Sequence, residues 1–174
     1  MNPTAPPLHL PLDPELEKLR VLAQALPVPA PRATLVWNAA VDVAEREALG
    51  GGPAGERWIV PITGGRFWGG AGYPQLAGTV RAGGADRQWL RPDGVKELRA
   101  EYEMQTFDGA VLTILNEVVI DESVQPERYA ASRIRVTAPE GPHAWLNRRL
   151  FVGTLQSLRP ARQAVLIRGY LVAC

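Results

Sequence analysis

The chain has 174 residues and a hydrophobic share of 46%, a size and composition that fit one globular domain with its own core. Its 19 Lys and Arg residues nearly balance its 18 Asp and Glu residues, which excludes a protein that gathers nucleic acid or an anionic membrane through its overall charge. The 17 glycines and 16 prolines exclude a protein built on long helices. The composition therefore favours a loop-rich globular fold.

The N-terminal extension, residues 1–31, is rich in proline and predicts one short helix. Asp13 is a suitable N-cap and Pro14 a suitable first helical residue, and leucines then recur at helical spacing until Pro27. We therefore expect a helix over residues 13–26. It would serve as a lid or partner-binding helix, or it would pack on its own domain.

The sequence also bears on the cellular compartment. No segment has the basic start and apolar stretch of a signal peptide, and none has the length of a membrane helix. The one cysteine, Cys174, excludes an internal disulfide, which gives no sign of an oxidising compartment. We expect a cytoplasmic protein without a membrane partner.

The helical period ends near residue 32, and short β-type runs follow, separated by Gly, Pro and Asp. The second domain, residues 32–174, is therefore expected to be all-β and antiparallel. Short strands at this spacing are typical of a sandwich or a barrel, and periodicity alone does not choose between them. The expected strands are residues 33–43, 56–63, 75–82, 87–91, 97–107, 110–120, 129–137, 147–155 and 163–172.

One hairpin can be interpreted in detail. Asp108-Gly109 lies between two β-rich runs and favours a two-residue turn with positive φ at both central residues. Such a turn places Tyr102 opposite Leu115 and turns the side chain of Glu117 to the same inner face of the sheet. A slip of one residue in the pairing would reverse the assignment.

A buried Glu117 beside Tyr102 suggests acid/base chemistry. Burial raises the pKa of a carboxyl group towards the range in which it exchanges protons near neutrality. The alternative is structural, because Glu117 is expected near the open end of its strand, where water or one of the C-terminal arginines would keep it ionised.

The chain lacks the sequence motifs of several common catalytic and cofactor-binding sites. Its two histidines and terminal cysteine have no zinc-site spacing, and none of its three serines occupies a Gly-x-Ser-x-Gly motif. Gly50-Gly51-Gly52 precedes a β-type run, so we interpret it as a flexible loop and not as a dinucleotide fingerprint. No metal site and no cofactor are expected.

A set of short motifs carries a family resemblance. In their order and spacing they resemble the bacterial and fungal domain-of-unknown-function family 3237 over residues 34–173. The resemblance implies a closed antiparallel β-barrel of about eight or more strands, filled by side chains or holding one small ligand. It implies no settled activity. The abrupt change of period near Pro31 predicts that the short helix lies outside the barrel wall. The motifs are Arg57, Gly64-Gly65, Leu76-Ala77-Gly78, Gly83-Gly84-Ala85-Asp86, Arg91-Pro92-Asp93-Gly94, Ala100-Glu101-Tyr102, Thr106-Phe107-Asp108-Gly109-Ala110 and Ala144-Trp145-Leu146-Asn147-Arg148.

The favoured function is a barrel that binds a small, mainly apolar organic molecule. Trp145 would line the cavity or fill the core, and Asn147 would contact the ligand or cap the backbone. The candidate ligand-binding residues are Tyr102, Trp145, Asn147, Trp89 and Arg133.

Two other functions stay open at this point. The first is a cofactor-independent isomerase, cyclase or lyase with Glu117 or an aspartate as acid/base and Tyr102 as hydrogen-bond donor. The second is nucleic-acid binding through C-terminal arginines, which comes last because the chain lacks the aromatic and basic motifs of RNA modules. The expected partner is a small molecule, and a homo-oligomer is compatible with the sequence.

Overall fold

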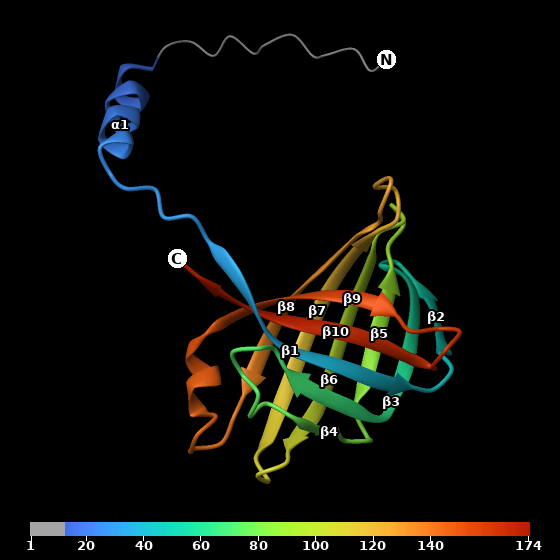
Figure 1. The fold of residues 1–174 in the computed structure, drawn as a ribbon. Coiled ribbons are helices and arrows are strands. Elements are labelled where there is room, and N and C mark those ends of the chain that lie inside the picture. The colour runs from blue at the N-terminus through green and yellow to red at the C-terminus, as the bar shows by residue number, and fades with distance from the viewer. Residues whose placement is uncertain (1–12) are drawn as a thin grey trace. The chain divides into compact units, whose positions relative to one another are not determined.

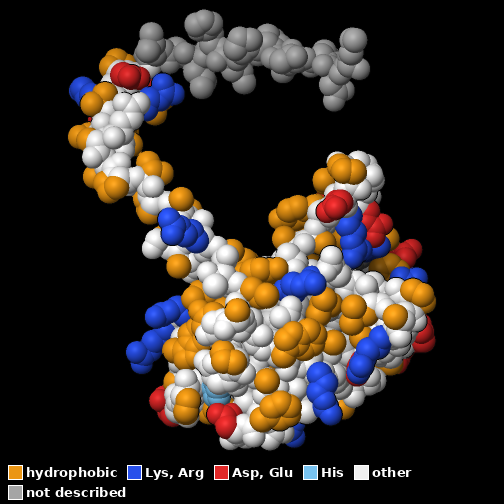
Figure 2. Space-filling view, in the orientation of Figure 1, with side chains coloured by type: hydrophobic (Ala, Val, Ile, Leu, Met, Phe, Trp, Pro, Cys, Tyr) orange, Lys and Arg blue, Asp and Glu red, His pale blue; other side chains and the backbone are white. Residues whose placement is uncertain are grey.

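The computed structural model describes residues 13–174, so the first twelve residues of the predicted extension lie outside the described part. The predicted helix is present as α1 (Pro14–Gln24). It starts as expected, since the Asp13 side chain accepts a hydrogen bond of 2.9 Å from the backbone N–H of Glu15. Hydrophobic side chains are exposed along the helix (Figure 2), and none of its residues is buried.

Pro31–Ala173 form a separate compact unit, a closed antiparallel β-barrel (Figure 1). The barrel closes because β1 pairs with β10 on one side and with β3 on the other. β4 and β5 each pair with both β3 and β6, so together they occupy one strand position between those two strands. β2 pairs only with β3. This gives eight strand positions in the barrel and two extra strands. The strands are β1 (Arg32–Val43), β2 (Glu47–Gly52), β3 (Gly55–Gly69), β4 (Gly78–Val80), β5 (Ala85–Leu90), β6 (Lys96–Thr106), β7 (Val111–Asp121), β8 (Tyr129–Thr137), β9 (Leu150–Ser157) and β10 (Ala164–Ala173).

The implied barrel is thus confirmed, whereas the prediction of a flexible loop at Gly50–Gly52 is wrong. These glycines end β2 and pair with β3, with Gly51 opposite Glu56 and Gly52 opposite Gly55. This pairing needs only backbone hydrogen bonds, so glycines can form a strand here although they have no side chains. No helix among residues 13–174 is long and apolar enough to cross a membrane.

β3 is longer than predicted because a glycine pair lets it bend without ending. Gly64 and Gly65 have φ values of +146° and +141°, a region that side chains rarely allow. A Cβ on Gly65 would also collide with the carbonyl oxygen of Ala40 on β1. The first half of β3 therefore pairs with β2 and β5, and the second half pairs with β1 and β4.

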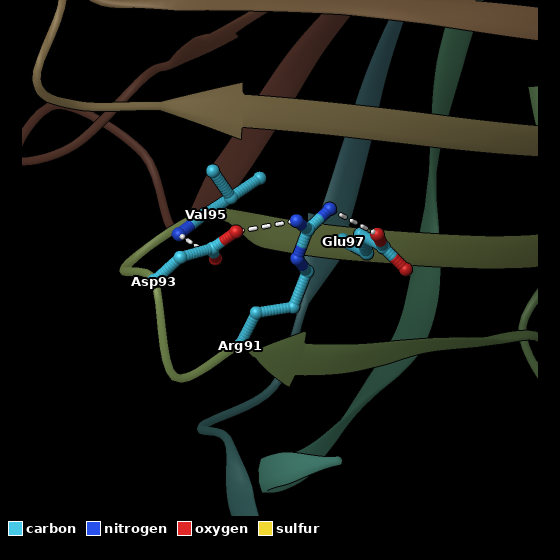
Figure 3. Close-up of polar contacts among 4 residues, drawn as sticks. All are labelled: Arg91, Asp93, Val95 and Glu97. Atoms are coloured by element: carbon cyan, nitrogen blue, oxygen red, sulfur yellow. Dashed lines mark hydrogen bonds and ion pairs between the residues drawn. The ribbon is translucent and has the colours of Figure 1, made fainter.

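One of the family-like motifs holds the turn between β5 and β6 (Figure 3). Arg91 donates a hydrogen bond of 3.0 Å to Glu97 and a second one to Asp93, and Asp93 Oδ1 accepts from the backbone N–H of Val95 at 3.2 Å. Gly94 has a positive φ of +84°, as its turn position requires. Asp93 is thus a turn residue, in agreement with its Asp-Gly sequence.

The interior near the 3-10 helix η1 (Ala144–Arg148) is densely filled. Leu146 from η1 is buried in the same cluster as Trp37 and Phe151. His143, which precedes η1, is 2% exposed, and its Nε2 lies 2.9 Å from Oδ2 of Asp108 in the β6–β7 turn. Side chains therefore fill this part of the barrel interior, so that a candidate site has to be sought elsewhere in it.

Candidate functional site

The turn between β6 and β7 decides which residues face the interior, and it differs from the predicted turn. The backbone N–H of Thr106 donates to the carbonyl of Ala110 at 2.9 Å, and that of Gly109 donates to the carbonyl of Thr106 at 3.0 Å. No residue other than glycine has a positive φ among those described, so Asp108 lacks the conformation that the predicted turn needs. The loop consists of residues 107–109, and the pairing shifts by one residue.

This shift replaces Glu117 with Asn116 on the inner face. Tyr102 lies opposite Ile114, and Ala100 lies opposite Asn116. Tyr102 faces the interior as predicted and is 1% exposed, and Asn116 is equally buried. The prediction that Glu117 points inward is wrong, because the three-residue loop moves every β7 side chain to the other face.

Glu117 lies on the outer wall and forms an ion pair. Arg133 on β8 donates from Nε to Glu117 Oε2 at 3.1 Å and makes a second bond from Nη2. The hydrogen bonds from Arg133 lower the pKa of Glu117, which is opposite to the shift that burial would cause. The alternative of a pair with a C-terminal arginine is confirmed. Trp89 lines the same outer groove as Glu117 and Arg133, so none of these three predicted site residues faces the interior.

Trp145 and Asn147 belong to the filled part of the barrel near η1. The Trp145 ring stacks on Tyr73 with 5.5 Å between ring centroids. Asn147 Nδ2 donates to the carbonyl of Ala138 at 2.9 Å, and its Oδ1 accepts from the backbone N–H of Ala138 at 2.8 Å. The backbone role of Asn147 is thus confirmed. The prediction that Trp145 shares a cavity with Tyr102 is wrong, since the residues lining the Tyr102 cavity do not include Trp145.

The barrel interior contains a cavity of about 40 Å³ away from η1. Its walls are mostly aliphatic, and the partly buried Val43, Leu155 and Val165 lie at or near the ends of their strands. The cavity therefore lies towards the barrel end at which β1 finishes and β10 begins. The residues that line it are Val41, Val43, Ile62, Asp86, Leu98, Ala100, Tyr102, Asn116, Val118, Leu155, Val165 and Ile167.

Three polar side chains meet in this aliphatic lining. Asp86 on β5 pairs with Ala100 on β6, and Ala100 pairs with Asn116 on β7, so the three form one row across the sheet. The methyl group of Ala100 leaves space between its two polar neighbours. Tyr102 projects from the next inward position of β6. The cavity is thus flanked by a carboxylate, an amide and a phenol.

One atom of each of these groups lacks a hydrogen-bond partner. Among residues 13–174, six buried side-chain nitrogen or oxygen atoms have no partner, and three of them are Asp86 Oδ1, Tyr102 OH and Asn116 Oδ1. Burying a polar atom without a partner is unfavourable, so such atoms are uncommon and need an explanation. Here they are explained if the cavity exists to hold a molecule.

Burial also changes the acidity of the groups in the cavity. It raises the pKa of Asp86 to about 6, although a hydrogen bond of 2.6 Å from Gln88 opposes the change. Burial, together with the charge of Asp86, raises the pKa of Tyr102 well above its usual value. Asp86 can therefore exchange a proton near neutral pH, while Tyr102 stays protonated and offers one O–H donor.

The predicted site residues include neither Asp86 nor Asn116. Asn116 interrupts an alternating apolar pattern made by Leu112, Ile114 and Val118, and this pattern taken alone would have turned Asn116 inward. Asp86 belongs to the family-like motif Gly83-Gly84-Ala85-Asp86, but its position just after a glycine pair is typical of a turn aspartate. No cluster of three His, Cys, Asp or Glu side chains that could hold a metal occurs in the described residues.

Comparisons with known proteins agree with this architecture. A family model described as "Protein of unknown function (DUF3237)" matches residues 31–172. A UPF0311 protein of Rhodopseudomonas palustris is 33% identical over 113 residues, which cover 58% of this chain and 71% of that protein.

Two solved structures have the same fold. A conserved protein of unknown function from Rhodopseudomonas palustris has a TM-score of 0.73 and 30% identity, covering 84% of this chain and 100% of its own. An enzyme from Penicillium herquei has a TM-score of 0.66 and 21% identity, covering 86% of this chain and 98% of its own. At that identity the likeness shows the fold alone.

Proposed function

The chain belongs to the DUF3237 family, whose function is unknown, and we therefore propose a function from its own interior: the barrel binds a small, mainly apolar organic molecule in the Asp86–Tyr102–Asn116 cavity. The observation that carries this proposal is the convergence of three unpartnered polar atoms on one aliphatic cavity. Apolar walls with a few converging polar groups are typical of small-molecule sites.

The energetics support a ligand at this position. A buried polar group without a hydrogen bond costs about 1–3 kcal/mol, and three such groups border a single cavity. A molecule that pairs with them recovers part of that cost and also buries its own apolar surface against the aliphatic wall. Both gains require the molecule to place its polar end between Asp86 and Asn116.

Protein-observed NMR with hexan-1-ol as a neutral probe tests the proposal. We expect saturable shifts in the signals of residues that line the cavity, at probe concentrations in the millimolar range, which corresponds to about 4 kcal/mol of binding free energy. Native mass spectrometry of the purified protein tests independently for a co-purifying small molecule. The proposal is wrong if hexan-1-ol leaves the cavity signals unchanged and no bound mass is found.

A matched pair of variants separates binding in the cavity from adsorption elsewhere. Ala100→Val adds two methyl groups inside the cavity, which has a volume of about 40 Å³, and Ala131→Val makes the same change at a position that lines the outer groove. We expect Ala100→Val to abolish binding and Ala131→Val to retain it. Equal binding by both variants would place the probe outside the cavity.

A second candidate function is a cofactor-independent acid/base enzyme, an isomerase, cyclase or lyase that acts in the same cavity. The observation in its favour is the pKa of about 6 for Asp86, next to the Tyr102 phenol. Asp86 would move the proton and Tyr102 would donate a hydrogen bond to the substrate, so Asp86 takes the role expected for Glu117. For a co-purifying molecule, turnover that Asp86→Asn abolishes without loss of binding would establish the enzyme.

The proposal also includes a cytoplasmic location. Cys174 is the one cysteine of the chain and is exposed and free, so the barrel does not rely on an internal disulfide. Fractionation of cells that express the natural protein, followed by immunoblotting, tests this part. Recovery from another compartment would refute it without affecting the cavity.

A further inference from the structure

We propose that the cavity selects molecules whose polar end donates hydrogen bonds, namely primary amines and alcohols, and that it rejects carboxylates. This inference rests on the proposed function and names the ligand class of the same cavity. It follows from the hydrogen-bonding capacity, the charge and the size of the site.

The unpartnered atoms of the cavity are mainly acceptors. Asp86 Oδ2 accepts from Gln88 at 2.6 Å, which leaves Oδ1 free, and Asn116 Oδ1 is a second free acceptor. Tyr102 OH supplies one donor and can also accept. A ligand group with two or three N–H or O–H bonds matches these acceptors. A carboxylate finds donors only in the Tyr102 phenol and the Asn116 amide, and it also meets the Asp86 carboxylate.

The charge of the cavity points the same way. No lysine, arginine or histidine is among the residues that line it, so an anion in the cavity would have no counter-charge. Asp86 and Tyr102 are the titratable groups of the lining, and ionised Asp86 repels an anion while it attracts an ammonium group. At this short range and in an apolar surrounding, the difference between the two signs is large.

The size of the cavity restricts the polar end further. A volume of about 40 Å³ accommodates only a few atoms, as in an ammonium or hydroxymethyl group. The remainder of the molecule has to extend along the aliphatic residues Val43, Leu155 and Val165 towards the end of the barrel. The predicted ligand is therefore slender, with one polar end and an apolar body.

Three probes with the same body test this selectivity: hexylamine, hexan-1-ol and hexanoate, titrated by calorimetry at about pH 8, where Asp86 is ionised. We expect a Kd for hexylamine at least about tenfold lower than that for hexanoate, with hexan-1-ol between them. Asp86→Asn should remove the advantage of hexylamine over hexan-1-ol. Glu117→Gln, the same kind of change on the outer wall, should leave all three Kd values unaltered.

The outcomes distinguish this inference from the proposed function. Hexanoate that binds as tightly as hexylamine, with binding lost in Ala100→Val, would overturn the selectivity and leave the binding proposal intact. Failure of all three probes to bind would overturn both. If Asp86→Asn does not fold, a pH titration of the natural chain replaces it: hexylamine affinity should fall as Asp86 is protonated below about pH 6, and a constant affinity would contradict the inference.

Discussion

Replacing Asp86 with asparagine should change the stability of the barrel in a way that depends on pH. Burial raises the pKa of Asp86 from the ordinary 3.8 to about 6 in the folded state. Between these two pH values the folded chain holds a proton at Asp86 that the unfolded chain has lost, so stability falls as pH rises. At about 1.4 kcal/mol per pKa unit, the full shift corresponds to about 3 kcal/mol, of which about 2 kcal/mol is lost between about pH 4 and pH 7.

The asparagine variant does not titrate at this position and so avoids this loss. Urea unfolding at several pH values, followed by tryptophan fluorescence, gives the unfolding free energy of both proteins. The variant should gain about 2 kcal/mol relative to the natural chain between about pH 4 and pH 7. Any constant effect of the new amide cancels, because only the change with pH is compared.

Glu117→Gln is the control, and its sign is opposite. The hydrogen bonds from Arg133 lower the pKa of Glu117, so this carboxylate stabilises the fold above its ordinary pKa, and the stabilisation disappears as pH falls through the lowered value. Glu117→Gln should therefore lose stability relative to the natural chain as pH rises. A constant difference for Asp86→Asn between about pH 4 and pH 7 would refute the assignment of Asp86 to a buried site.

Three further predictions concern other contacts. Tyr102→Phe removes an unpartnered buried hydroxyl and should stabilise the fold by about 1 kcal/mol, a rise of about 2–4 °C in Tm by calorimetry; a lower Tm would show that the hydroxyl is paired. Asn147→Ala leaves both backbone groups of Ala138 without partners and should cost about 1–3 kcal/mol in urea unfolding, and an unchanged midpoint would contradict this. Hydrogen bonds from Thr106 and His143 lower the pKa of Asp108, so Asp108→Asn should destabilise the chain more at neutral pH than below the lowered pKa; equal losses at both pH values would exclude a stabilising contribution from the ionised Asp108 carboxylate.

Much of the fold could be predicted because the strands alternate regularly. β8, for example, has the bounds that its β-type run predicts, residues 129–137. The Gly50–Gly52 part of β2 could not be predicted, because three glycines carry no side-chain pattern and their pairing with β3 depends on the backbone of a neighbouring strand. The local sequence pattern thus predicts strands whose side chains alternate, whereas the glycine-rich end of β2 forms through pairing with a neighbouring strand.

The site depended on a single turn. The Asp-Gly sequence correctly indicated a hairpin, but it fits both a two-residue loop and a three-residue loop with positive φ only at glycine. The three-residue loop places Asn116 opposite Ala100. A two-residue loop would place Glu117 there. Tyr102 was assigned correctly, because the opposite face of β6 carries only polar residues, including Arg99, Glu101, Glu103 and Gln105. Asp86 becomes a site residue only when the barrel closes, since its neighbours come from other strands.

The closure of the barrel also limits how copies of this chain could aggregate. Unpaired backbone groups along a strand edge are the usual template for adding a strand from another molecule. Of the strands in residues 13–174, β2 is the one with a partner on only one side, and three of its six residues are glycines that offer no side chains to a stacked sheet. Among these strands, β2 thus offers the one edge that is open along its whole length, and there Glu47 adds a negative charge in each copy.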